Sequence, residues 1–204
     1  MVDAGIISAL REYPTGNLCN AHSDIQAMTA TIKPLFSGIR IAGPAKTAVI
    51  TPGQNAAIHR AVHTADCGQV LVVDGGGDRC FGPFGDILAT SCRNQGIVGA
   101  VIDNTIRDVA DIKEMQFPVY CLGANPAATD KTDPGSIDVE VTCGGLRVRP
   151  GDIIVGDDDG VVVIPVEIAA EVADRVQIVA EREREIKQGL ANGLTTCEIF
   201  QIPT

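Results

Sequence analysis

The chain contains a group of charged side chains whose types and spacing suit a metal ion and an anionic substrate. Arg107 and Asp108 stand side by side in "GAVIDNTIRDVAD", shortly after the apolar run "GAVI", and twenty residues separate Asp86 from Arg107. An arginine guanidinium donates forked hydrogen bonds to a carboxylate or a keto oxygen. Two carboxylates with room for several waters suit Mg²⁺ or Mn²⁺ better than Zn²⁺.

The residues around Asp86 add a second means of holding an anion. The sequence "GDILATSCRNQG" predicts a helix that begins at Gly85 and Asp86. The first N–H groups of a helix have no partners within the helix, and they bind carboxylates or phosphates. Gly82 and Gly85 would let a ligand approach the backbone closely.

A second interpretation of these residues involves no function. Asp at a helix start is a common N-cap, and an Arg beside an Asp is often a weak ion pair on the surface. Both interpretations stay open from spacing alone. His59 and His63 lie four residues apart on a predicted helix, which is a metal-ligand spacing. Nothing nearby completes such a site, so we expect these histidines on the helix surface or in the core.

Strands and helices alternate in the middle of the chain and would position these groups. Apolar runs at 68–77, 97–103 and 117–122 predict buried strands, the first of them stopped by its glycines. Segment 54–65 predicts a helix before the first of these strands, and segment 85–96 predicts a helix between the first and the second. This pattern predicts βαβ units with parallel strands, and ligands bind beyond the carboxyl ends of such strands. Asp86 would then face Arg107 and Asp108 if the first two strands are neighbours.

The remaining segments complete an α/β fold, which we expect to be a single domain over residues 1–204. Residues 37–51 contain β-forming pieces broken at Gly43 and Pro44. Residues 136–165 contain short strands separated by Gly-Gly, Pro-Gly and "DDDG" turns, which predict hairpins. A long helix runs from near Pro165 to about Gly189, and its second half is almost wholly charged. We expect that half to lie in solvent or over a neighbouring subunit.

Composition argues against several classes of protein. Sixteen Lys and Arg residues against 26 Asp and Glu residues give a formal charge of −10, and no basic patch for nucleic acid is present. Seven cysteines without a CxxC pair suggest reduced thiols in the cytoplasm. No signal-peptide pattern and no apolar run of membrane-spanning length occurs. We expect a cytoplasmic protein that binds neither nucleic acid nor membrane.

The spacing Asp86-x20-Arg107-Asp108-x2-Asp111 resembles the D-x20-R-D-x2-E/D signature of the RraA-like family. Other matching stretches are "IAGPAKTAVITPGQNAAIHRAV", "GQVLVVDGGG", "GIVGAVIDNTIRD" and "VRPGDIIVGDDDGVVVIP". That family includes class II 4-hydroxy-4-methyl-2-oxoglutarate/4-carboxy-4-hydroxy-2-oxoadipate aldolases and proteins called regulator of RNase E activity A. Asn104 stands where the family often has glycine, and we expect asparagine to tolerate a left-handed backbone there.

The resemblance implies a fold, an assembly and a metal site. The fold would be a swivelling β/β/α-type sandwich with a parallel βαβ core, C-terminal hairpins and a long terminal helix. The assembly would be a homotrimer or homohexamer with sites between subunits. Mg²⁺ or Mn²⁺ would be held mainly through Asp108, with Asp86 bonded to a metal water and Asp111 further from the ion.

The resemblance also implies how a substrate would bind. Arg107 would contact the keto oxygen of a pyruvate unit, and Glu183 of a neighbouring subunit is the candidate base for a substrate hydroxyl. The pyruvate carboxylate would be held by the backbone amides of one loop, namely Gly85, Asp86, Ile87 and Leu88.

Two functions follow from the resemblance. The first is a divalent-metal-dependent lyase that cleaves oxo acids to pyruvate through an enolate, by retro-aldol cleavage or by oxaloacetate decarboxylation. The second is a non-catalytic regulator that binds and inhibits an RNase. The regulators of the family lack the acidic residue at the position of Asp86, so its presence here favours the enzyme.

Overall fold

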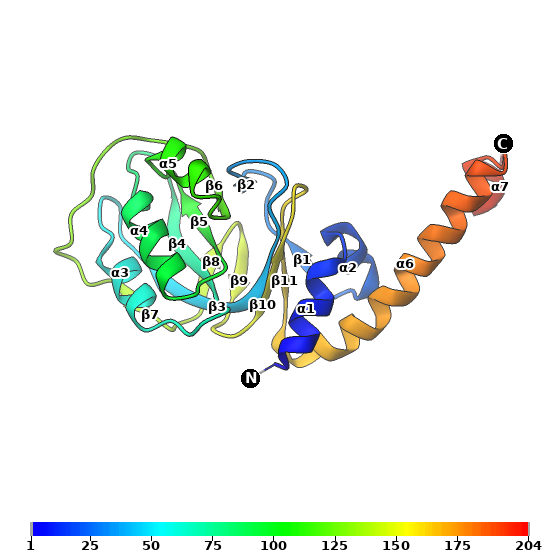
Figure 1. The fold of residues 1–204 in the computed structure, drawn as a ribbon, viewed down its shortest axis with the longest axis horizontal. Helices are drawn as coiled ribbons and strands as arrows, with labels where there is room; N and C mark the ends of the chain where they lie inside the picture. Colours follow the sequence, from blue (N-terminus) through cyan, green and yellow to red (C-terminus); the bar gives the residue numbers. More distant parts are fainter. Residues whose placement is uncertain (1, 204) are drawn as a thin grey trace.

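Four parallel strands form the centre of the fold and are joined by helices (Figure 1). The computed structural model describes residues 2–203. Each strand pairs in parallel with the next one along the chain, so β4 and β5 are neighbours and the predicted βαβ units are confirmed. The bounds are β3 Ile41–Val49, β4 Val70–Asp78, β5 Gly99–Asn104 and β6 Val119–Cys121.

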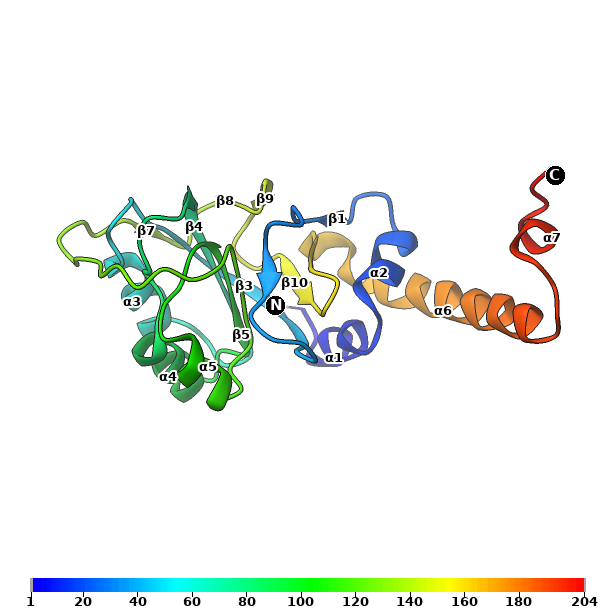
Figure 2. The ribbon, with the colours of Figure 1, turned by 90° about the horizontal axis from the view of Figure 1, so that it is seen from above.

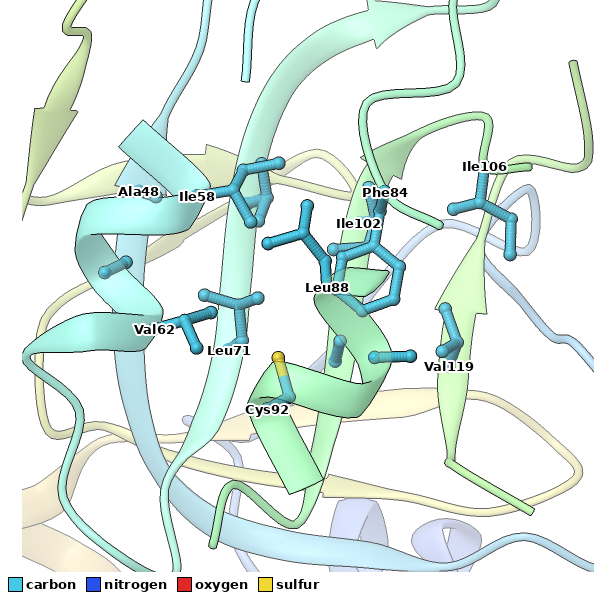
Figure 3. Close-up of a cluster of buried hydrophobic side chains, with 14 of the residues drawn as sticks. Ala48, Ile58, Val62, Leu71, Phe84, Leu88, Cys92, Ile102, Ile106 and Val119 are labelled. Carbon is cyan, nitrogen blue, oxygen red and sulfur yellow. The ribbon is translucent and has the colours of Figure 1, made fainter. Parts of the chain in front are cut away.

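Three helices cover one face of these strands with their apolar stripes. Ile58 and Val62 project from the first helix, and Leu88 and Cys92 project from the second (Figure 3). All four are buried against the sheet, where they exclude water from its face. The bounds are α3 Ala56–His63, α4 Asp86–Asn94 and α5 Val109–Glu114.

An aromatic pair anchors the loop that leads into α4. Phe84 is fully buried directly before Gly85, and its ring stacks on that of Phe117 with the centroids 6.4 Å apart. Because a buried aromatic side chain is costly to displace, the start of α4 is fixed relative to the sheet.

Antiparallel strands form a layer on the opposite face, which gives the β/β/α arrangement. Val70, Val72 and Val101 pack there against Val141 and Val148. Two hairpins confirm the "GG" and "DDDG" turns. Their strands are β8 Val141–Cys143 with β9 Leu146–Val148, and β10 Ile153–Gly156 with β11 Val161–Ile164. Short strands extend the edges: β1 Gln26–Ala27, β2 Lys33–Pro34 and β7 Ser136–Ile137.

The predicted Pro-Gly hairpin is wrong, because β9 and β10 belong to different sheets. The turn directs the chain away from β9 and toward β3. The Gly151 N–H donates to the Ala45 carbonyl at 3.0 Å, and the Ala45 N–H donates to the Asp152 carbonyl at 2.8 Å.

The predicted break at Gly43 and Pro44 is also wrong, because β3 is one continuous strand that changes partners there. Ile41 to Pro44 pair antiparallel with β10, and Ala45 to Val49 pair in parallel with β4. Proline has no N–H to donate and is tolerated where one ladder ends. Gly43 is required by close packing, since a Cβ there would lie 2.3 Å from the Gly68 carbonyl oxygen.

The first glycine-rich segment does not stop its strand as predicted. β4 continues through Gly76 and Gly77 to Asp78, and its register against β5 shifts between Val73 and Asp78. Gly76 and Gly77 have φ values of 65° and 72°, which are accessible to glycine and let the strand bulge.

Helices form the end of the molecule that lies away from α3, α4 and α5 (Figures 1 and 2). The first half of the long helix packs on two N-terminal helices and β10, and the second half projects beyond the body, as its charge predicted. The first N-terminal helix was not predicted, because only Leu10 in it is fully buried and its apolar pattern is short. The bounds are α1 Ala4–Glu12, α2 Thr15–Ala21, η1 Val166–Ile168, α6 Ala169–Ala191 and α7 Thr196–Phe200. None of the helices between residues 2 and 203 is long and apolar enough to cross a membrane.

Candidate active site

The fold brings together Asp86, Arg107 and Asp108, as the βαβ prediction required. Asp86 is the first residue of α4, and the other two follow β5. The Asp108 Oδ2 atom accepts hydrogen bonds from the Asp86 N–H and from Arg107 Nε, both at 3.3 Å. The Arg107 N–H donates to the Phe84 carbonyl at 2.9 Å. The turn after β5 is therefore tied to the anchored start of α4.

Two glycines make this close approach possible. A Cβ on Gly85 would lie 2.3 Å from Asp108 Oδ2 and 3.1 Å from the Arg107 Cγ. A Cβ on Gly82 would lie 2.4 Å from the Asn125 carbonyl oxygen. The side chains of Arg107 and Asp108 are 37% and 31% exposed, so they form a half-buried group at a strand edge and not a solvated surface pair.

Asp108 adopts a left-handed backbone conformation, with φ 56° and ψ 40°. It occupies the N-cap position of α5, yet its side chain does not cap that helix. The carboxylate turns instead toward the N-terminus of α4. Left-handed residues other than glycine are uncommon and cluster at functional sites. The left-handed residue expected at Asn104 is thus found at Asp108, and Asn104 ends β5 with its Oδ1 accepting from the Thr105 N–H at 2.7 Å.

The first amides of α4 already bind carboxylates, but those carboxylates belong to the protein. The Asp86 N–H donates to Asp108, and the Ile87 N–H donates to the Asp86 Oδ1 atom at 2.7 Å. These N–H groups thus act as donors to carboxylates, and their binding of a ligand anion stays a prediction.

A hollow of about 130 Å³ opens beside these groups. A second hollow, of about 270 Å³, lies on the other side of the turn and is lined by Arg107, Asp108 and Asn125, among others. The residues that line the smaller hollow come from α3 and its N-cap, the loop before α4, α4 itself, the turn after β5 and the loop before β7: Asn55, His59, Gly82, Pro83, Gly85, Asp86, Ile87, Leu88, Arg107, Asp108, Thr129 and Lys131.

Sequence reasoning missed Asn55, His59 and Lys131 as members of this site. His59 projects into the smaller hollow, whereas His63 is exposed and lines neither hollow described here. Burial lowers the pKa of His59, and the positive charge of Lys131 lowers it further, so the imidazole is neutral at physiological pH. The spacing of Asn55 and His59 on one side of α3 was the available signal.

The chemistry of the donors fits a hydrated divalent cation. Within residues 2–203, no group of three or more His, Cys, Asp or Glu side chains is arranged to hold a metal ion. Asp86 and Asp108 each keep one carboxylate oxygen without a hydrogen bond to the described part of the chain. Mg²⁺ and Mn²⁺ are held in this way, by one or two carboxylates plus waters.

Two predicted residues lie outside this cluster. Asp111 is exposed in the first turn of α5 and lines neither hollow. Glu183 lies on α6, at the opposite end of the molecule (Figure 1), where it accepts from Asn17 Nδ2 at 2.8 Å and pairs with Lys187. Those two partners lower the pKa of Glu183.

Known proteins share both the sequence pattern and this architecture. Residues 15–163 match the RraA-like family, described as Aldolase/RraA. A protein of Halalkalibacterium halodurans, provisionally named 4-hydroxy-4-methyl-2-oxoglutarate aldolase, is 41% identical over 159 residues, which cover 78% of this chain and 76% of that protein.

Two solved structures extend the comparison over most of the fold. An uncharacterised protein from Pseudomonas syringae superposes with a TM-score of 0.84 at 25% identity, over 95% of this chain and 92% of that one. RraAS2 of Streptomyces coelicolor, an unusual member of the RNase ES inhibitor RraA protein family, superposes with a TM-score of 0.80 at 28% identity, over 95% and 98% of the two chains. The sequence motif, the β/β/α layers and these matches together show that the chain belongs to the RraA-like family.

Proposed function

We propose that the protein is a divalent-metal-dependent lyase that releases pyruvate from oxo acids. Its reactions are retro-aldol cleavage of substrates such as 4-hydroxy-4-methyl-2-oxoglutarate, decarboxylation of oxaloacetate, or both. The observation that carries the proposal is the convergence of Arg107 and two carboxylates on the N-terminus of α4. The aldolase name of the Halalkalibacterium halodurans relative supports the same class of reaction.

Both reactions develop negative charge on the keto oxygen of a pyruvate unit as the adjacent carbon–carbon bond breaks. The Arg107 guanidinium donates hydrogen bonds to that oxygen and stabilises the charge where it forms. Asp108 and Asp86, each with one carboxylate oxygen free of hydrogen bonds within residues 2–203, would hold the cation. A bound Mg²⁺ or Mn²⁺ supplies Lewis-acid stabilisation of the same oxygen.

The amides at the start of α4 orient the substrate. The substrate carboxylate accepts hydrogen bonds from the Asp86 and Ile87 N–H groups. Without substrate, these two N–H groups donate to the carboxylates of Asp108 and Asp86. A water held by Asp86 then delivers a proton to C3 of the enolate.

The base for the substrate hydroxyl comes from another copy of the chain in this proposal. Glu183 lies too far along α6 to serve its own site (Figure 1). Glu183 of the partner subunit would reach the hollow in a homotrimer or homohexamer, since α6 projects from the body. The seven free cysteines support a cytoplasmic location, where thiols stay reduced.

The alternative function is inhibition of an RNase by docking. It is favoured by one observation, the similarity to RraAS2 of Streptomyces coelicolor over nearly the whole chain. Asp86 argues against it, because a docking protein needs no carboxylate held beside Arg107 and a helix N-terminus.

Pyruvate release, coupled to lactate dehydrogenase, tests the lyase proposal. We expect turnover of oxaloacetate or 4-hydroxy-4-methyl-2-oxoglutarate with Mg²⁺ or Mn²⁺, and loss of turnover with excess EDTA and in Arg107→Ala. Arg93→Ala is the matched control, because Arg93 is exposed in the last turn of α4 and the only hydrogen bond of its side chain within residues 2–203 goes to the Met115 carbonyl. Folded, metal-replete protein that turns over neither substrate would contradict the proposal.

A further inference from the structure

Two carboxylates outside the candidate active site lie side by side at the ends of β4 and β5. Val73 and Ile102 pair in the parallel ladder, and the next residue of each strand is an aspartate, Asp74 in one and Asp103 in the other. Neighbouring strands are about 5 Å apart, so two negative charges meet at this point of the sheet. Both aspartates are half-buried, and the proposed lyase chemistry uses neither of them.

Both carboxylates accept hydrogen bonds from the backbone of one hairpin, β8–β9. The Asp74 Oδ2 atom accepts from the Thr142 N–H at 2.9 Å, and the Asp103 Oδ2 atom accepts from the Gly144 N–H at 3.2 Å. Cys143 lies between these two amides and is fully buried. The two aspartates therefore hold β8 on either side of a covered thiol.

The hairpin depends on its contacts with the rest of the molecule. β8 and β9 form a two-stranded sheet of their own, and a two-stranded hairpin is marginally stable alone. Val141 and Val148 pack on the central strands, and the Thr29 N–H donates to the Gly144 carbonyl at 2.8 Å. Residues 28–32, which supply that last bond, contain no charged side chain. The charges that act on the docked hairpin thus come mainly from the ends of β4 and β5.

The surroundings of Asp103 favour uptake of one proton by the pair. Burial raises the pKa of Asp103, the Gly144 N–H lowers it, and the negative charge of Asp74 raises it again. Arg79, in the loop after β4, lowers this pKa, but the net direction is upward. Cys143 is a further titratable neighbour, and burial together with the two aspartates raises its pKa, so its thiol is uncharged at neutral pH.

We propose that Asp74 and Asp103 form a pH-sensitive latch for the β8–β9 hairpin. With one proton on the pair, the two N–H bonds hold the hairpin on the sheet. With both carboxylates ionised, their repulsion makes the hairpin open more often, which uncovers Cys143. The latch does not rest on the proposed lyase function, because it involves none of the residues assigned to that chemistry.

The direction of the pH effect follows from linkage between protonation and folding. A carboxyl whose pKa is raised in the folded chain contributes stability that is fully present below its ordinary pKa. That contribution is lost as the pH rises through the raised value. The hairpin should therefore be held most firmly in mild acid and should open more often toward alkaline pH.

Hydrogen exchange at the Thr142 and Gly144 amides tests the latch. Protection factors compare each rate with that of an unstructured chain at the same pH, and in the native protein they should fall at least about threefold from about pH 5 to about pH 8. Asp103→Asn keeps an oxygen for the Gly144 N–H and mimics the neutral acid, so its protection should stay high across this range. Asp174→Asn, which changes an exposed carboxylate on α6, should repeat the native pH dependence.

A thiol reagent provides a second measurement on the same preparations. At about pH 8, Cys143 should react with a neutral maleimide at least about threefold faster in the native protein than in Asp103→Asn. Cys92, which is buried between α4 and the sheet, should react equally slowly in both proteins and is the internal control. Native protection that is constant with pH, a fall of equal size in Asp103→Asn, or equal labelling of Cys143 in the two proteins would overturn the inference.

Discussion

Two clusters in this molecule are built from arginine and aspartate, and they differ in how fully their hydrogen bonds are used. In the first, Arg107 Nε makes one bond of 3.3 Å to Asp108, and each acidic side chain keeps an oxygen free. In the second, Arg149 donates to Glu167 at 2.8 and 2.7 Å and to Asp152 at 3.0 Å. The second cluster borders a hollow of about 670 Å³, much larger than the one at Arg107.

The difference lies in how fully the charged groups are hydrogen-bonded, and it favours the Arg107 cluster as the candidate site although its hollow is smaller. Asp152 is 4% exposed, and its carboxylate also accepts from the Arg149 and Val166 N–H groups at 2.9 and 3.3 Å. The bonds of the Arg149 side chain to Glu167, and those to Asp152, raise the pKa of Arg149. The bond from Arg149 lowers the pKa of Glu167. Little capacity is left for a ligand, so the cluster locks the turn before β10, while the Arg107 cluster remains ready to bind.

The largest effect should come from breaking the unsaturated cluster. Arg107→Ala removes the donor that we propose for the enolate oxygen, so kcat for pyruvate release should fall about 10²- to 10³-fold. The thermal midpoint should change little, because Arg107 makes few bonds that hold the fold. Steady-state kinetics and a melting curve of the same preparation check both parts. A large fall in the midpoint with proportionate loss of activity would place Arg107 with the structural cluster instead.

The second largest effect should come from filling the space beside Asp108 that Gly85 leaves open. In Gly85→Ala the new Cβ meets Asp108 Oδ2 and displaces the carboxylate, so we expect kcat/KM to drop about 10- to 100-fold through misplacement of the site. Gly16→Ala is the control, because a Cβ on Gly16 has no atom within 4 Å. Unchanged kinetics for Gly85→Ala would show that Asp108 need not keep its position.

The saturated cluster should respond in stability and not in chemistry. Asp152→Ala leaves two partly buried N–H groups without acceptors and breaks the bonds from Arg149, and we expect a loss of about 2 kcal/mol in the free energy of unfolding. Asp108→Asn, which keeps a residue that tolerates the left-handed backbone, should cost less than about 0.5 kcal/mol but abolish most activity. Urea titrations measure the free energy of unfolding of both variants. Equal losses in Asp152→Ala and Asp108→Asn would contradict the distinction between a structural and a functional cluster.

The smallest effect concerns pH. Arg149 lowers the pKa of Glu167 in the folded chain, so this pair stabilises the protein above the ordinary glutamate pKa. The contribution is lost as the pH falls through the lowered value, because both folded and unfolded forms are then protonated. The difference in thermal midpoint between native protein and Glu167→Gln should therefore shrink from about pH 6 to about pH 3. A difference that persists in acid would mean that the ion pair is not its cause.

The sequence predicted the parts of the site that depend on strand and helix periodicity. Asp86, Arg107 and Asp108 could be brought together because a continuous apolar run predicts a buried strand and the spacing between them fits one βαβ crossover. The left-handed turn at Asp108 was not predicted, since it depends on contacts with the start of α4 rather than on local preference.

Lys131 and Asn55 escaped prediction for a related reason. Lys131 lies in a loop without periodicity, and its place is set by hydrogen bonds between Asp130 and residues 53–55, far away in the sequence. The sequence predicted a break at Pro44, because a proline within a strand normally interrupts the ladder to its neighbour. β3 continues through Pro44 because it changes partners there, from β10 to β4, and this pairing cannot be read from local sequence. Tertiary pairing decided each of these features.

The change of partners along β3 has a consequence for how the molecule melts. One strand supplies a ladder to β10 with its first half and a ladder to β4 with its second half, so neither sheet can come apart without disturbing the other. The protein should therefore unfold in one cooperative transition, and the slowest amide protons to exchange with deuterium should be those of β3. The edge that carries the candidate site thereby draws its rigidity from the whole molecule.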